Sequence, residues 1–240
     1  MPWNAAVFKT RTLTAIVFAA VMLAGIFING WLYSLLILVI MVGAFYEFHR
    51  LMKITHGEKY MRYFPLAILY VLLPLMMLLQ LGFTHTSRTE NGVNFIVPSV
   101  VYNPLMPAMI IFSIWINDTM AYIVGSLIGK TPFSKISPKK TWEGTIGGAI
   151  LCMAVITLAG AFIPALQVLH WKHWMVIATL CAVFGTLGDL FESRLKRRAG
   201  VKDSGSFMPG HGGFLDRFDS LLFASPAVWL YLQLFLRWQQ

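Results

Sequence analysis

Two pairs of acidic residues stand at the ends of apolar runs in the C-terminal half of the chain. Asp189 and Glu192 are three residues apart at the end of one run, and Asp216 and Asp219 are three apart at the start of the next. Residues at this spacing share one face of a helix. Carboxylates at this density suit Mg²⁺, which takes one or two of them together with phosphate oxygens and water.

Basic residues and glycines accompany these carboxylates. The basic residues are Lys196, Arg197, Lys202 and Arg217, and the glycines are Gly210, Gly212 and Gly213. The cations supply hydrogen-bond donors suited to phosphate, and the glycines let the backbone approach an anion closely. The combination indicates a metal-assisted phosphoryl or nucleotidyl transfer site.

Each acidic pair also has a simpler interpretation. Asp216 and Asp219 fit the first turn of a helix, where the helix dipole and free N–H groups favour carboxylates. Asp189 and Glu192 fit an ordinary helix end that enters water with mixed charge. The spacing alone leaves both interpretations open, and only the accumulation of residue types in one segment favours chemistry.

The segment 129–148 adds a second basic loop. Ser137-Pro138 and Thr141 are typical helix-start residues. Lys139 and Lys140 precede that helix, and a helix N-terminus with lysines suits phosphate. The following Gly144 and Gly148, spaced four apart, predict close packing against a neighbouring helix.

Asp118 lies inside an apolar run, about ten residues from its end. An ionisable group there costs about 2.5–3.5 kcal/mol on insertion. The position therefore predicts either a polar cavity that the carboxylate lines, or a structural hydrogen bond with Asn117 or a nearby threonine.

The composition identifies the elements that must position these residues. The chain of 240 residues is 58% hydrophobic and 12% charged, whereas a soluble domain carries about 25% charged residues. It is therefore predicted to be an integral membrane protein. Cys152 and Cys181 both fall inside apolar runs, where a disulfide or metal role is not expected.

Seven apolar runs approach the length of a membrane span: 13–28, 31–48, 64–82, 105–128, 146–166, 173–190 and 220–236. Asn29-Gly30 marks a turn between the first two. The stretch 93–104 is short and punctuated by proline, so it is not assigned as an eighth span. We expect an all-α helical bundle with N-terminal helices in 1–104 and a catalytic region in 105–240, together forming one membrane unit.

The basic residues predict the orientation of this bundle. Of the 19 Lys and Arg residues, all but Arg88, Lys172 and Arg237 fall in loops on one side of a seven-span arrangement. Cytoplasmic loops are rich in Lys and Arg, so the N-terminus and the two chemical loops are predicted to face the cytoplasm. This asymmetry accounts for most of the net charge of +9 without a nucleic-acid partner.

The segment 193–219, SRLKRRAGVKDSGSFMPGHGGFLDRFD, resembles the signature of the phosphatidate cytidylyltransferases, also called CDP-diacylglycerol synthases. WINDTMAYIVGSLIGK and ISPKKTWEGTIGG resemble the upstream blocks of that family, so the resemblance covers about residues 115–225. YEFHRL (46–51) is the one family-like stretch in the N-terminal part. The chain is short for the family, which leaves its helix count and N-terminal packing open.

The resemblance implies that CTP and phosphatidic acid react to give CDP-diacylglycerol and pyrophosphate. It implies a multi-pass protein of the cell membrane whose active site faces the cytoplasm. It implies a requirement for Mg²⁺, with a second cation and a homodimer left open. A CTP-dependent kinase or cytidylyltransferase acting on another membrane lipid is the alternative. A transporter with Asp118 and Asp189 on an ion path is disfavoured because the sequence has no internal repeat.

Each candidate site residue then has an expected role. The expected metal ligands are Asp189, Asp216 and Asp219. The expected catalytic residues are Ser193, Lys196, Arg217, Lys140 and Asp118, of which the cations hold phosphate oxygens, Ser193 helps to hold phosphate and Asp118 completes a polar cavity. Further substrate contacts are expected from Lys139, Lys202, His211, Gly212 and Gly213, with His211 as a structural or phosphate hydrogen bonder.

Overall fold

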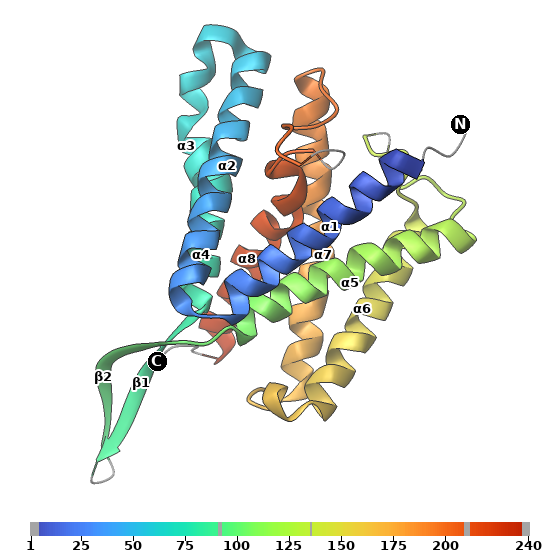
Figure 1. Cartoon of the computed structure of the whole chain (residues 1–240). Coiled ribbons are helices and arrows are strands. Elements are labelled where there is room, and N and C mark those ends of the chain that lie inside the picture. Colours follow the sequence, from blue (N-terminus) through green and yellow to red (C-terminus); the bar gives the residue numbers. More distant parts are fainter. Residues whose placement is uncertain (1–4, 91–92, 135, 209–211, 237–240) are drawn as a thin grey trace.

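The computed structural model describes residues 5–90, 93–134, 136–208 and 212–236, and this part of the chain is mostly helical (Figure 1). The long helices are α1 (Ala5–Phe27), α2 (Gly30–His56), α5 (Leu105–Ile128), α6 (Trp142–Phe162), α7 (Trp171–Arg198) and α8 (Leu215–Leu236). Between α2 and α5 the chain forms η1 (Gly57–Tyr63), α3 (Phe64–Ala67), η2 (Ile68–Leu72) and α4 (Leu73–Leu81), and a short η3 (Pro164–Leu166) precedes α7.

All seven predicted runs fall on helices. Within the described residues, five helical segments are long and apolar enough to cross a membrane: Gly30–Leu81, Leu105–Ile128, Trp142–Phe162, Trp171–Arg198 and Leu215–Leu236. The first of them reverses direction at η1 (Figure 1), and a shorter apolar helix covers Thr12–Phe27. A helical membrane protein is therefore confirmed, whereas seven spans and a cytoplasmic N-terminus stay predictions.

A two-stranded ribbon departs from the expected all-helical fold. Strands β1 (Phe83–Glu90) and β2 (Val93–Tyr102) pair antiparallel, and the ribbon projects from the bundle (Figure 1). The stretch 93–104 is thus mainly a strand. The pairing register shifts between His85 and Thr86, opposite Pro98. A proline has no N–H to donate to a partner strand, so a bulge accommodates it.

Two helix boundaries differ from the predicted spans in a way that shapes the site. Helix α7 continues to Arg198, eight residues past the predicted end at 190, so Glu192 and Lys196 lie on the helix and not in a loop. An ion pair between these two residues, four apart, stabilises the extension. Helix α8 begins at Leu215, so Asp216 and Asp219 both lie on its first turns, as their spacing requires.

Small residues let α5 and α6 approach closely. A Cβ atom on Gly144 or Gly148 would overlap the backbone of Ala121, and one on Gly144 would also meet Gly125. The predicted packing role of these two glycines is confirmed. The loop between α5 and α6 also lies close to α7, since its Lys140 pairs with Asp189.

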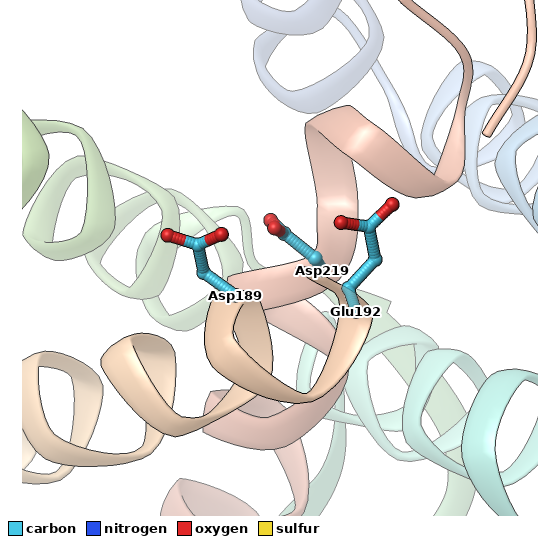
Figure 2. A group of neighbouring side chains, drawn as sticks. All are labelled: Asp189, Glu192 and Asp219. Carbon is cyan, nitrogen blue, oxygen red and sulfur yellow. The ribbon is translucent and has the colours of Figure 1, made fainter. Parts of the chain in front are cut away.

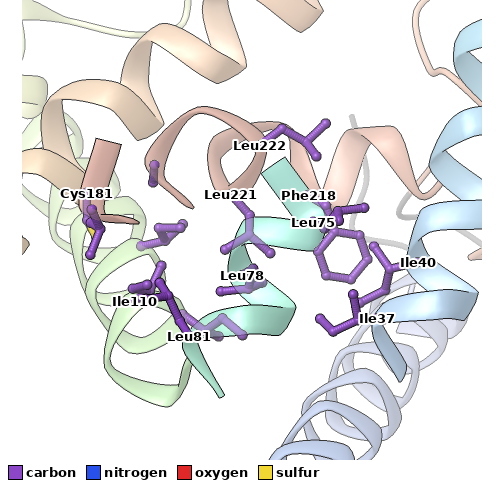
Figure 3. Packing of buried hydrophobic residues seen from close by; sticks show 14 of the residues in the cluster. Ile37, Ile40, Leu75, Leu78, Leu81, Ile110, Cys181, Phe218, Leu221 and Leu222 are labelled. Atoms are coloured by element: carbon purple, nitrogen blue, oxygen red, sulfur yellow. The ribbon is translucent and has the colours of Figure 1, made fainter. Parts of the chain in front are cut away.

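The core lies where α2, α4, α5, α7 and α8 meet (Figure 3). Its members include Ile37, Ile40, Leu75, Leu78, Leu81, Ile110, Cys181, Phe218, Leu221 and Leu222, each at most 5% exposed. Cys152 and Cys181 are free and buried. Many large apolar side chains stay exposed on the outer faces, among them Val42, Leu127 and Phe162, as expected for surfaces that contact lipid.

The connections sort to two ends of the bundle (Figure 1). The turn at η1, the segment 129–141 and the segment 199–208 lie toward one end, and the turn at 28–29, the ribbon and η3 lie toward the other. The first set contains seven of the 19 Lys and Arg residues of the sequence, and the second contains one, Arg88. The loops that hold the candidate chemistry therefore share one end of the molecule.

Candidate active site

Three carboxylates converge where α7 meets the start of α8. Asp189 and Glu192 come from α7 and Asp219 from α8, and their side chains lie side by side (Figure 2). One oxygen from each lies within 4.8 Å of the others. Glu192 is completely buried and Asp219 is 9% exposed, so water screens their mutual repulsion poorly.

This group fits a divalent cation. Glu192 Oε2 lies 2.5 Å from Lys196 Nζ, whereas the buried Oε1 has no hydrogen-bond partner among the described residues. A buried carboxylate oxygen without a donor is costly unless a cation or ordered water satisfies it. Three oxygen donors within reach of one point are the ligand type that Mg²⁺ takes.

Asp216, which was predicted to bind metal, has other partners. Its Oδ1 lies 2.6 Å from Lys196 Nζ, and its Oδ2 accepts hydrogen bonds of 2.8 Å from the N–H groups of both Ser204 and Gly213. The bond to Gly213, three residues earlier, resembles the half of a capping box in which a carboxylate accepts from a preceding N–H. The protein's own donors thus surround Asp216. The residue that lies beside Asp189 and Asp219 is Glu192.

The glycine turn holds this aspartate. Gly212 has φ of +87°, which favours glycine. The amide of Gly213 was expected to face a phosphate, but it donates to Asp216 Oδ2. The anion at this turn is therefore a side chain of the protein.

A polar cavity of about 420 Å³ opens beside the carboxylates. Its lining includes Asp118, Lys139, Lys140 and Asp189, from α5, the 129–141 segment and α7. Lys140 forms an ion pair with Asp189, and Ser193 Oγ donates to Asp189 Oδ1 at 3.3 Å. Asp189 therefore belongs both to the lining of the cavity and to the cluster of three carboxylates.

Asp118 fits both interpretations that the sequence left open. Asn117 Nδ2 donates to Asp118 Oδ1 at 3.4 Å, which is a weak structural contact. The side chain of Asp118 is nevertheless exposed, on the side where the polar cavity opens. It faces a polar space and is not enclosed by apolar helices.

The 129–141 segment is tied to the helix that follows it. Thr141 is the N-cap of α6 and accepts from the N–H of Gly144 at 3.1 Å, as predicted. Glu143 accepts from the N–H of Lys130 at 3.2 Å and from Thr131 Oγ1 at 2.8 Å. These bonds hold the loop that carries Lys139 and Lys140.

The remaining predicted residues do not line this cavity. Lys202 is exposed in the segment between α7 and α8. Arg217 is exposed and lines a separate small space with Met22 and Trp115. His211 lies outside the described residues.

Comparison with known proteins shows which family the sequence matches. The model of the cytidylyltransferase family matches residues 9–107 and 92–235, which includes the carboxylate group and the polar cavity.

The chain belongs to the cytidylyltransferase family.

Curated members of this family named phosphatidate cytidylyltransferase are similar to the chain. A Bacillus subtilis protein is 45% identical over 123 residues, which are 51% of this chain and 45% of that protein. A Synechocystis protein is 44% identical over 130 residues, 51% and 41% of the two chains. Phosphatidate cytidylyltransferase 4 of Arabidopsis thaliana chloroplasts is 44% identical over 131 residues, 54% and 33%. The matched part of the chain thus spans less than half of each relative.

Sequence reasoning assigned no role to two buried carboxylates of this region. Glu192 was noted beside Asp189 but interpreted as part of an exposed helix end. Its spacing of three residues from Asp189 placed both side chains on one helical face, and the structure shows that Glu192 is buried there. Glu47 falls in the family-like stretch 46–51 and was assigned no role. It is 5% exposed and contacts the segment that holds Asp216.

Proposed function

We propose that the chain transfers CMP from CTP to phosphatidic acid, giving CDP-diacylglycerol and pyrophosphate for phospholipid synthesis. The observation that carries the proposal is the polar cavity with Lys139 and Lys140, joined through Asp189 to three converging carboxylates at one end of the bundle. Family membership and the names of the relatives support the same reaction.

The chemistry requires little acid–base assistance. An oxygen of the lipid phosphate attacks the α-phosphorus of CTP, and the bond to the pyrophosphate oxygen breaks. The attacking phosphate is already an anion at neutral pH, so the main barrier is repulsion between two anions. Cationic side chains that position both phosphates lower that barrier.

Asp189, Glu192 and Asp219 would hold Mg²⁺ in this scheme. The ion would neutralise phosphate charge and orient the phosphate oxygens. Two observations support this assignment: the buried Glu192 Oε1 has no hydrogen-bond partner in the described part of the chain, and three carboxylates lie close together. The three acidic residues together could also share a second cation.

The other side chains have separate tasks in the proposal. Lys140 and Lys139 bind phosphate oxygens in the cavity, whose lining Asp118 helps to keep polar. Ser193 holds Asp189 and reaches phosphate from the same helix turn. Lys196 balances the charge of Glu192 and Asp216. Arg217 and Lys202, both exposed, contact the incoming phosphates from the membrane surface.

The placement in the cell follows from the charge pattern. We propose seven spans in the plasma membrane with a cytoplasmic N-terminus, so that the basic end of the bundle meets CTP from the cytoplasm. The acyl chains of phosphatidic acid then stay in the bilayer. Assembly as a homodimer is compatible with this arrangement.

The direct test is an assay of the purified protein with labelled CTP, phosphatidic acid and Mg²⁺. We expect labelled CDP-lipid and release of one pyrophosphate per product. Failure to form CDP-lipid across several detergents and salt concentrations would overturn the proposal. Transfer of label from γ-labelled CTP to a lipid would instead indicate a CTP-dependent lipid kinase.

The variant Asp219→Asn tests the metal assignment within that assay. It should lower the rate by about 100-fold or more, since even outer partners of metal ligands contribute about 10–100-fold. The matched control is Glu58→Gln, which removes an exposed carboxylate in η1 and should leave the rate unchanged. A full rate in Asp219→Asn at low Mg²⁺ would contradict the assignment.

A further inference from the structure

Glu47 is a buried carboxylate far in sequence from the groups that donate hydrogen bonds to it. It lies on α2, is 5% exposed, and accepts hydrogen bonds from three groups of the segment 204–215. The donors are Ser204 Oγ at 2.6 Å, the N–H of Phe214 at 3.0 Å and the N–H of Leu215 at 2.9 Å. No other acidic residue of α2 exists to share this task.

These bonds cap α8 from another helix. The first N–H groups of a helix have no partner within it. Glu47 supplies the acceptor for Leu215, the first residue of α8, and for Phe214 before it, and its charge lies at the positive end of the helix dipole. The start of α8 is thus held by α2 and not only by its own sequence.

Two glycines make room for the contact. A Cβ atom built on Gly205 or on Gly213 would overlap the carboxylate of Glu47. The backbone of the segment therefore closes around this side chain from two sides. This close approach gives a second reason for glycine at position 213, besides its bond to Asp216.

Ser204 connects Glu47 to the site. Its hydroxyl lies 2.6 Å from Glu47 Oε2 and 2.9 Å from Asp216 Oδ2. A hydroxyl donates only one hydrogen, so the two carboxylates share it. Asp216 in turn holds Lys196, which pairs with Glu192 of the carboxylate group.

We propose that Glu47 is a positioning residue that sets the placement of α8, and through it of Asp219 and of Asp216, the partner of Lys196, relative to α7. The proposal concerns α2, a helix outside the segment that carries the chemical signature, and as a statement about catalysis it rests on the proposed function. Glu47 touches no substrate in this scheme. It acts through the N-terminus of α8 and through Ser204.

The test uses Glu47→Gln, with Glu58→Gln as the matched control. An amide presents one acceptor oxygen and one NH₂ group, so at least one donor of the segment loses its partner. We expect kcat to fall about tenfold, as one unsatisfied buried donor costs enough free energy for this change. The KM for CTP should stay nearly constant, because the cavity lysines are untouched.

Two further readouts do not depend on activity. Hydrogen exchange at the amides of 213–219 should speed up in Glu47→Gln and stay unchanged in Glu58→Gln. Binding of Mn²⁺, followed by its EPR signal in the purified protein, should weaken in the first variant only. If the wild-type protein forms no CDP-lipid, the proposed function fails, but these two measurements still test Glu47.

Ser204→Ala keeps the proposal testable if Glu47→Gln does not fold. It should reproduce the faster exchange and the lower kcat to a smaller extent. Where both variants fold, the double variant should lose less than the product of the two single effects, because both act on one network. Wild-type kcat, exchange and Mn²⁺ binding in folded Glu47→Gln, or independent effects in the double variant, would overturn the proposal.

Discussion

Asp216 and Asp219 share a helical face yet have different surroundings. Asp216 has Lys196 and two backbone N–H groups as partners, so its charge is balanced by the protein. Asp219 lies beside Asp189 and Glu192, so its negative charge is next to two others. Spacing of three residues sets the shared face, but the neighbouring helix and loop decide what each carboxylate meets.

This difference gives a prediction for Glu192→Gln and Asp216→Asn. Glu192→Gln should raise the Mg²⁺ concentration for half-maximal rate about tenfold, because it removes a charged ligand. Asp216→Asn should mainly destabilise the protein, by about 3 kcal/mol, because it leaves Lys196 with only Glu192 and weakens the bonds to Ser204 and Gly213.

The measurements are the Mg²⁺ dependence of the rate and the thermal unfolding of both variants in detergent. The two quantities separate a metal ligand from a structural anion. A larger shift of the Mg²⁺ requirement in Asp216→Asn than in Glu192→Gln would restore the metal site of Asp189, Asp216 and Asp219 that the spacing suggested.

At the scale of elements, the site depends on how closely α7 approaches α8. Gly188 lies one residue before Asp189, and a Cβ atom there would overlap the backbone carbonyl of Asp219. Gly185, one turn earlier, would place its Cβ 3.4 Å from the Cβ of Ser220, which is ordinary contact. The two glycines on one face therefore differ in how much space they have.

We expect Gly188→Ala to push the start of α8 away from α7 and Gly185→Ala to be tolerated. Overpacking of this kind costs about 1–3 kcal/mol, and the displaced Asp219 should reduce the rate as well. Thermal unfolding and CDP-lipid formation of the two variants check this. Equal behaviour of both would show that the helices can separate without affecting the site.

At the scale of the whole molecule, charge and architecture agree. The basic connections gather at one end of the bundle and the ribbon and η3 at the other (Figure 1). A hydrocarbon layer between these ends would contact exposed side chains such as Val42 and Phe162. Under the proposed function, the site then lies near the membrane surface, where a lipid phosphate and a water-soluble nucleotide meet.

Labelling of single cysteines tests the topology. Glu58→Cys in η1 and Val168→Cys before α7 introduce exposed thiols at opposite ends of the bundle. The native Cys152 and Cys181 are 0% exposed and should react little. An impermeant maleimide added to intact cells should label Val168→Cys but not Glu58→Cys, and the pattern should invert in inside-out vesicles. Labelling of both from one side would contradict the proposed orientation.

Several properties of this protein followed from the sequence by itself. Hydropathy over whole segments located the long apolar helices, because a bilayer requires about 20 apolar residues wherever the chain crosses it. The helix start at Thr141 and the close packing at Gly144 and Gly148 followed from local chemistry. The concentration of carboxylates, cations and glycines indicated the type of reaction.

The tertiary structure decided which of these residues meet. Burial of Glu192 depends on α8, the partners of Asp216 depend on a loop and α7, and Glu47 reaches Ser204 across 157 residues of sequence. The ribbon at 83–102 depends on pairing between two strands. Periodicity describes one element at a time, whereas burial and hydrogen bonding depend on the surfaces that two elements bring together. Local patterns therefore predicted the elements, and only the packing decided which side chains meet.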